Sequence, residues 1–191
     1  ILSAYSPHER EMRRYGRPSI GSGLVFPISE DDIMIDPIRI EDHWPRIAAI
    51  DFGWDHPTAL VWCAVDNESE TFYIYDCYRA SKASPTVHAQ NIRMRPHFIP
   101  IAYPHDGNRR DSMGNPGLAD QYRNLGCNFL LQHFTNPPAL GTDKGSNSIE
   151  EGLMAMLQKV EAGKFKVFNT LGDWFEEFRM YHRKDGKVVP L

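Results

Sequence analysis

The sequence predicts an α/β fold built on a mixed sheet, and three observations carry that prediction. Residues 46–79 hold three short apolar runs separated by turn residues, as in an antiparallel meander. From Ser84 onward, helical and strand-like segments alternate, which implies parallel strands joined by crossover helices. The first run ends in an acidic residue, Asp51, followed by a turn. We therefore expect a central sheet flanked by helices, with a carboxylate at its edge.

Apolar and β-branched residues mark the strands of the first half. The runs 46–52, 59–65 and 71–78 have this character, and turn residues at 53–57 and 66–69 separate them. Because the connections are short, we expect neighbouring runs to pair in antiparallel fashion.

The middle of the chain changes to helix and strand in alternation. Ser84 and Pro85 suit the N-cap and the first residue of a helix. A strand is expected at 99–103, a helix at 117–125 and another strand at 128–134.

The last third follows the same alternation. Ser148 begins a capping-box pattern that opens a helix running to 162–163. A short strand at 166–168, a helix at 173–182 and a turn at 185–186 complete the expected elements. An antiparallel meander followed by βαβ alternation is the order of elements of a ribonuclease H-like fold.

The 191 residues fit one domain with a lead-in. Residues 1–45 mix charge with Pro and Gly, and we expect them to form an extended linker that packs on the domain. Residues 46–191 are expected to form the ribonuclease H-like domain.

Composition excludes some function classes. A net charge of −4 and a pI near 6.1 argue against a uniformly basic nucleic-acid binder, although a local basic face is compatible with them. The three cysteines form no CxxC pair, so buried reduced thiols of a cytoplasmic protein are expected. No run approaches the roughly 18 apolar residues of a membrane span.

Two acidic residues end apolar runs. Asp51 follows Ile47–Ile50, and Asp106 comes shortly after Ile99–Tyr103. If the two strands are adjacent and parallel, both carboxylates lie in the crevice beyond the strand ends, where a divalent metal can bind. The alternative is that each Asp is only a turn residue that accepts a backbone hydrogen bond.

The neighbours of these residues have two interpretations each. Asp55 is an outer-sphere ligand or an Asx-turn residue. His105 acts in proton transfer or orients Asp106, or it is a structural hydrogen-bonded residue.

Specific strings resemble a known family. Trp44–Ala59, Ala102–Gly107, Gly145–Gly152 and Gly163–Phe168 look like the nuclease domain of a tailed-bacteriophage large terminase subunit, of the headful-packaging type of short-tailed phages. The resemblance implies an endonuclease that cuts concatemeric viral DNA in the host cytoplasm. It also implies double-stranded DNA, a terminase small subunit, a portal protein and the ATPase domain of the same polypeptide as partners.

In that family, metal ions are held by acidic residues, and Asp51 and Asp106 match two of the positions. The third aspartate of the family follows the final hairpin, and no match to it occurs before the sequence ends at Leu191. The ATPase phosphate loop GxxxxGK[ST] is also absent from this sequence.

Two-metal phosphodiester hydrolysis is the chemistry expected of such carboxylates, with Mg²⁺ or Mn²⁺ as the ions. We expect Asp51 to bridge both ions and Asp106 to bind one. The expected DNA contacts are phosphate contacts, and cleavage is expected to be largely independent of base sequence. A catalytically silent DNA-gripping or docking module of the packaging motor is the alternative, and a junction resolvase is a weaker one. The candidate phosphate-binding residues are Arg109, Arg110 and Lys144, together with Arg93 and Arg95 at the end of a helix. Each of them could instead be a solvated surface charge.

Overall fold

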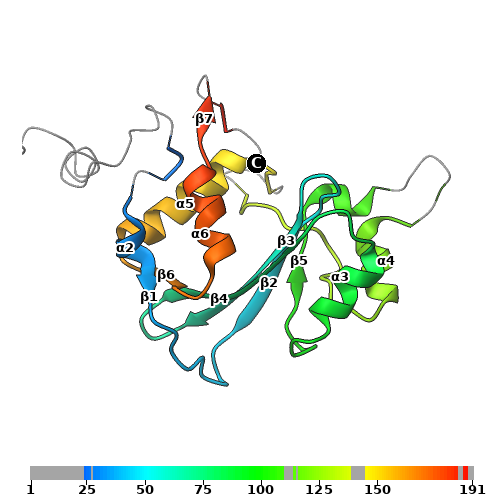
Figure 1. Ribbon diagram of the computed structural model, residues 1–191, viewed down its shortest axis with the longest axis horizontal. Coiled ribbons are helices and arrows are strands. Elements are labelled where there is room, and N and C mark those ends of the chain that lie inside the picture. Colours follow the sequence, from blue (N-terminus) through cyan, green and yellow to red (C-terminus); the bar gives the residue numbers. More distant parts are fainter. Residues whose placement is uncertain are drawn as a thin grey trace, which may run out of the picture.

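A six-stranded mixed sheet organises the structure, in the strand order β1-β6-β4-β3-β2-β5. Figure 1 shows helices on both sides of it, with α3 and α4 on one face and α5 and α6 on the other. The expected α/β, ribonuclease H-like arrangement is confirmed. The computed structural model describes residues 24–26, 28–109, 114, 116–138, 145–184 and 187–188.

The centre of the sheet is the predicted meander. Strands β2 (Arg46–Asp51), β3 (Thr58–Asp66) and β4 (Thr71–Ala80) pair in antiparallel fashion. The register of β3 against β4 shifts by a bulge between Trp62 and Cys63. The three strands were predicted to within two residues at each end, because each is an apolar run bounded by turn residues.

Parallel strands extend the meander on both sides. Strand β5 (Ile101–Ala102) pairs in parallel with β2, and β6 (Phe165–Phe168) pairs in parallel with β4. A short helix, α2 (Glu30–Ile33), leads into β1 (Met34–Ile35), which pairs in parallel with β6. The parallel pairing expected from the βαβ alternation is therefore confirmed.

Four longer helices cover the sheet. They are α3 (Pro85–Ile92), α4 (Leu118–Asn124), α5 (Ile149–Glu161) and α6 (Gly172–Met180). The Oγ atom of Ser148 accepts a hydrogen bond from the Glu151 amide at 3.4 Å, as the capping-box pattern predicted. No such side-chain bond is made by Ser84 at the start of α3.

A hairpin of β7 (Arg183–Lys184) and β8 (Lys187–Val188) follows α6. The predicted turn at residues 185–186 lies outside the described residues. Among the described residues, no helix is long and apolar enough to cross a membrane.

The strand expected at 128–134 does not form. Only Phe129 makes a parallel bridge, to Ile101. Beyond it the chain leaves the ladder. The Leu130 amide donates to the Ile101 carbonyl, but the amide that donates to the Tyr103 carbonyl is that of Phe134, four residues further on. This prediction was wrong because its apolar residues do not all point to the core: the Leu131 side chain is 88% exposed.

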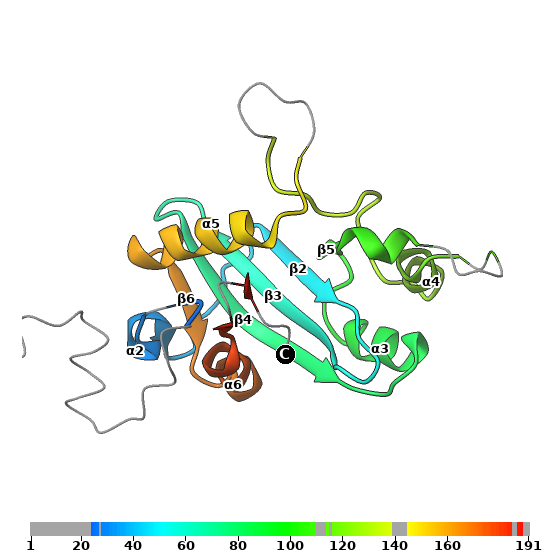
Figure 2. The same cartoon turned by 90° about the horizontal axis from the view of Figure 1, so that it is seen from above.

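Each face of the sheet has its own core. Leu60 and Trp62 pack with α3 and α4, whereas Ile74 and Val167 pack with α5 and α6. Figure 2 shows α6 beside β4, viewed nearly along the helix axis. On the face that carries α5 and α6, strand β2 presents exposed residues, so this side of its carboxyl end is open to solvent.

Candidate metal centre

Asp51 is the last residue of β2 and is exposed. Side chains alternate along a strand, and the neighbouring Ile50 points into the core under α3 and α4. Asp51 therefore projects on the opposite face, the one that carries α5 and α6.

A tight turn fixes the chain immediately after Asp51. The Gly53 amide donates to Thr58 Oγ1 at 3.2 Å, and the Thr58 hydroxyl donates to the Gly53 carbonyl at 2.9 Å. A Cβ atom at Gly53 would lie 2.3 Å from the His56 carbonyl oxygen, so only glycine fits there. Because Thr58 is 2% exposed, the turn is anchored to the body of the domain. Asp55 lies in this turn with its side chain exposed.

Asp106 lies in the 3-10 turn His105–Asn108, which follows β5. Since β5 is parallel to β2, the two strands end at the same edge of the sheet. The predicted juxtaposition of two strand-end carboxylates rested on adjacent, parallel strands, and the sheet has that topology.

The residues beside the two aspartates also pack together. A Cβ atom added at Gly107 would lie 2.7 Å from Cε2 of Phe52 and 2.7 Å from Cδ2 of Tyr103. Phe52 follows Asp51 and Gly107 follows Asp106, so the ring sits directly against the turn. The Phe52 ring stacks in turn on Tyr122, which holds it in the core.

The charge of Asp106 acts on the Asp51 carboxyl. Burial is the main cause that raises the pKa of Asp51, the negative charge of Asp106 raises it further, and the Phe52 amide lowers it by hydrogen bonding. Although Asp51 as a residue is exposed, it lines a pocket whose other walls surround it. Within the described part of the chain, neither carboxylate forms an ion pair with a cationic side chain.

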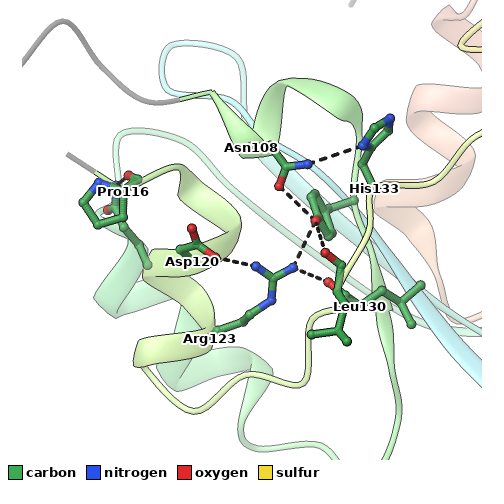
Figure 3. A network of polar contacts seen from close by, with 9 residues as sticks. Asn108, Pro116, Asp120, Arg123, Leu130 and His133 are labelled. Atoms are coloured by element: carbon green, nitrogen blue, oxygen red, sulfur yellow. Dashed lines mark hydrogen bonds and ion pairs between the residues drawn. The ribbon is translucent and has the colours of Figure 1, made fainter. Parts of the chain in front are cut away.

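A polar network holds the turn that carries Asp106 (Figure 3). The Tyr103 hydroxyl donates to Oδ1 of Asn108 at 3.0 Å, and Nδ2 of Asn108 lies 3.3 Å from Nδ1 of His133. Nη2 of Arg123 donates to the Tyr103 hydroxyl at 3.0 Å and also to the Leu130 carbonyl. Tyr103 is 1% exposed, so the network ties the turn to a buried anchor.

Arg123 is itself fixed from two sides. Its Nη1 lies 2.5 Å from Oδ1 of Asp120 on the same helix, and its guanidinium stands over the Tyr103 ring at 5.3 Å. No local sequence pattern signals this network, because its members are scattered between residues 103 and 133.

A pocket of about 560 Å³ opens beside Asp51. It lies between the sheet and the two helices α5 and α6. Its walls are mostly apolar and aromatic, and the polar side chains in them are Asp51, His56, Arg79, Glu177 and Tyr181. Arg79 and Glu177 were not predicted, since nothing in the local pattern of β4 or α6 sets them apart.

The remaining candidates are scattered. His105 is exposed, with its ring 6.4 Å from that of His133. Arg109 is exposed at the end of the turn, and its amide donates to the Asp106 carbonyl at 2.9 Å. Arg110 and Lys144 lie outside the described residues.

Arg95 is engaged in the body of the domain. It makes two hydrogen bonds to the Asp76 carboxylate, at 2.9 and 3.1 Å, and lies over the Trp62 ring at 4.5 Å. Trp62 belongs to the core under α3 and α4, which places Arg95 on the face opposite Asp51. Its neighbour Arg93, the C-cap residue of α3, is exposed.

The two candidate ligands, Asp51 and Asp106, fit a hard divalent cation. Asp51 and Asp106 offer carboxylate oxygens with no cation to neutralise them in the described part of the chain, which suits Mg²⁺ or Mn²⁺. In the described ranges, however, no third His, Cys, Asp or Glu completes a cluster around them. The pair is therefore a partial ligand set.

Comparison with known proteins places the chain in a family. The terminase RNaseH-like domain family matches residues 48–189. The large terminase subunit of Salmonella phage P22 is 37% identical over 190 residues, which are 99% of this chain and 37% of that protein. The chain thus spans little more than a third of the length of that relative.

Solved structures agree with this family. The nuclease domain of the P22 large terminase has 35% identity and a TM-score of 0.79, over 91% of this chain and 87% of that one. The large terminase nuclease of the thermophilic phage G20c, solved with bound cobalt, shares the fold at 16% identity and a TM-score of 0.56, over 90% of this chain and 88% of that one. The chain belongs to the family of terminase RNaseH-like domains.

Proposed function

We propose that this chain is a metal-dependent DNA endonuclease domain that cuts concatemeric viral DNA during genome packaging. The pairing of Asp51 with Asp106 carries the proposal. Two carboxylates at the ends of adjacent parallel strands, without cationic partners in the described part of the chain and with the charge of Asp106 acting on Asp51, support a divalent-metal site. Family membership supports a nuclease, because the P22 relative of known structure is a nuclease domain.

Asp51 and Asp106 would hold the metal, with Asp51 as the ligand shared between two ions and Asp106 as a ligand to one. Bound Mg²⁺ or Mn²⁺ would lower the pKa of the attacking water and neutralise charge on the phosphate. The protein's own part is positional. The Thr58–Gly53 turn and the Tyr103–Asn108 bond hold the two carboxylates at one edge of the sheet. Asp55 and His105 are proposed as outer residues of this site, and the exposed Arg109 as a phosphate contact beside it.

The substrate would be double-stranded DNA, bound through its backbone and cut with little regard to base sequence. No element of the site is proposed to read bases; the expected contacts are phosphate contacts by arginine and lysine. For the whole protein, we propose an ATPase domain on the same polypeptide. The proposed partner proteins are a terminase small subunit and a portal protein, and the proposed location is the host cytoplasm. Residues 46–191 are proposed as the nuclease domain and residues 1–45 as a lead-in, of which β1 joins the edge of the domain's sheet.

A second candidate function is a catalytically silent module that grips DNA or docks within the packaging complex. One observation favours it: only two acidic ligands come together among the described residues. The two functions differ in whether metal ions produce cut DNA.

Nicking of supercoiled plasmid tests the choice. The chain is incubated with plasmid in Mg²⁺, in Mn²⁺ and in EDTA, and the relaxed and linear products are measured and their ends sequenced. The endonuclease proposal expects nicking in metal alone, with ends spread over many sequences. Binding of the plasmid without any nicking in either metal would favour the silent module.

A further inference from the structure

Asp51 and Arg79 stand in one row across the sheet. Asp51 of β2 pairs with Ala59 of β3, and Ala59 pairs with Arg79 of β4. Residues that are directly paired point to the same face, so all three side chains project toward α5 and α6. Two strand spacings separate the outer pair by about 10 Å. Since Ala59 is small, the space between the carboxylate and the guanidinium stays open, and all three residues line the same pocket.

Arg79 is the one Lys or Arg among the described residues that line this pocket. Its surroundings are acidic. Nε of Arg79 lies 3.2 Å from Oε1 of Glu177, and Nη1 lies 3.4 Å from Oε2 of Glu176. Burial and the charges of Asp173, Asp51 and Glu176 raise the pKa of Glu177, while Arg79 lowers it. The cation is thus held by α6 in a wall whose other charged groups are negative.

These ion pairs are partly open to solvent. The side chains of Arg79 and Glu177 are 31% and 32% exposed, and that of Glu176 is 59% exposed. Partly exposed pairs of this kind are weak and are screened by salt. A phosphate group, which can accept two parallel hydrogen bonds from a guanidinium, is a strong competitor for the same donor.

We propose that Arg79 binds a backbone phosphate of the DNA beside the Asp51 site, and that Glu176 and Glu177 of α6 hold its guanidinium until DNA displaces them. The inference rests on the proposed nuclease function, for which it supplies a DNA contact and a restraint. The two carboxylates restrain DNA binding, because a DNA phosphate must displace them from Arg79 before the backbone can bind next to Asp51.

The test is binding of a 30-base-pair duplex by fluorescence anisotropy in EDTA, over a series of salt concentrations. Four proteins are compared: the chain as it is, Arg79→Gln, the double variant Glu176→Gln/Glu177→Gln, and the triple variant combining all three changes. Arg79→Gln should weaken binding by about fivefold and reduce the salt dependence by about one counterion, as expected when one phosphate contact is lost. The double variant should bind several-fold more tightly than the unchanged chain.

The triple variant separates the proposal from simple charge. If the two glutamates act by holding Arg79, their replacement should have no effect once Arg79 is glutamine. If they only repel DNA at a distance, affinity rises equally in both backgrounds, and the proposal is overturned. It is also overturned if Arg79→Gln leaves affinity and salt slope unchanged, or if neither the unchanged chain nor the double variant binds DNA.

A matched control is the ion pair of Lys164 with Glu70, at 2.7 Å. It joins the start of β6 to the turn between β3 and β4, at the opposite end of the strands, roughly 20 Å from Ala59 by strand rise. Lys164→Gln and Glu70→Gln should leave duplex affinity within about twofold. Melting temperatures of all variants report whether the fold is intact.

The outcome is independent of cleavage, because binding is measured without metal. Loss of nicking in Asp51→Asn together with unchanged binding in Arg79→Gln would remove this inference and leave the nuclease proposal standing. If the variants show the predicted binding pattern but no protein nicks DNA in metal, the role of Arg79 in DNA binding stands and the nuclease proposal is removed.

Discussion

The ring of Phe52 packs against the backbone of Gly107, so closely that a Cβ atom at Gly107 would lie 2.7 Å from Phe52 Cε2. Each of these residues directly follows one of the two candidate metal ligands. The contact therefore links the end of β2, which carries Asp51, to the turn after β5, which carries Asp106.

Gly107→Ala should disturb this link. The added methyl group meets two rings, that of Phe52 and that of the buried Tyr103, and overpacking of this kind costs about 1–3 kcal/mol. Urea unfolding should show the loss of stability, and nicking should fall with it. Gly172→Ala is the control, because a Cβ atom there meets nothing within 4 Å at the first residue of α6. Equal stability of the two variants would contradict the contact.

Asn108→Ala should loosen the turn without unfolding the domain. Asn108 accepts from Tyr103 at 3.0 Å, and the Tyr103 hydroxyl keeps its contacts with Leu131 and Arg123 when that acceptor is lost. We expect a stability loss of at most about 1 kcal/mol. Weakened support for a ligand such as Asp106 should lower Mn²⁺ affinity by about tenfold.

The comparison for this variant is Asn91→Ala. It removes a side-chain hydrogen bond of 3.0 Å, from Asn91 to the Val87 carbonyl on the surface of α3, and should leave Mn²⁺ affinity unchanged. Calorimetric titration of both variants with Mn²⁺ measures the two affinities. An Asn108→Ala protein that binds Mn²⁺ as well as the Asn91→Ala protein would show that the network does not position Asp106.

Asp51→Asn should stabilise the metal-free protein at neutral pH. Burial and the charge of Asp106 raise the pKa of Asp51 in the folded state above its ordinary value of 3.8. A raised pKa in an acid favours folding only where the carboxyl is protonated, and this contribution is lost as the pH rises through the folded-state pKa. Asparagine carries no charge to bury.

The variant should therefore melt at a higher temperature than the unchanged chain at pH 7 in EDTA, and the difference should shrink as the pH falls toward 4. Thermal unfolding over this range measures it. Asp55→Asn, in the exposed turn, serves as the control. A variant that is less stable than the unchanged chain at pH 7 would mean that favourable contacts stabilise the charged Asp51 carboxylate by more than burial and Asp106 destabilise it.

Asp106→Asn should bring the pKa of Asp51 down. Since burial is the larger cause and the Asp106 charge the smaller, the pKa of Asp51 should fall and still remain above 3.8. Titration of the Asp51 carboxyl by NMR measures the change. No change at all would show that the two carboxylates are too far apart to share a metal ion.

The positions of the two aspartates after strand ends could be predicted from sequence because the signal is local, whereas their role as metal ligands stays a prediction. Each follows a short apolar run and comes with a glycine-containing turn, and the position of a residue at the end of a buried strand needs no knowledge of the rest of the fold. Adjacent, parallel placement of the two strands was a condition of that prediction, and the β2–β5 pairing meets it.

Arg79 and Glu177 could not be found in the same way. Arg79 lies on the same face of the sheet as Asp51 because of the registers of two strand pairs, β2–β3 and β3–β4. The second pair contains a bulge between Trp62 and Cys63. A shift of one residue would have turned the Arg79 side chain to the other face. Glu177 depends further on how α6, which lies far along the chain, docks on the sheet. The expected strand at 128–134 failed for a related reason, since the Leu130 carbonyl accepts a hydrogen bond from the side chain of Arg123 on α4.

The most direct test of the metal centre is the rate of plasmid nicking in Mn²⁺ by four proteins: the unchanged chain, Asp51→Asn, Asp106→Asn and Asp55→Asn. We predict that both Asp51→Asn and Asp106→Asn lose at least about 100-fold in rate, while Asp55→Asn loses less than about tenfold and EDTA stops all cutting. Metal-dependent nicking by Asp51→Asn at the rate of the unchanged chain would contradict the assignment of the site.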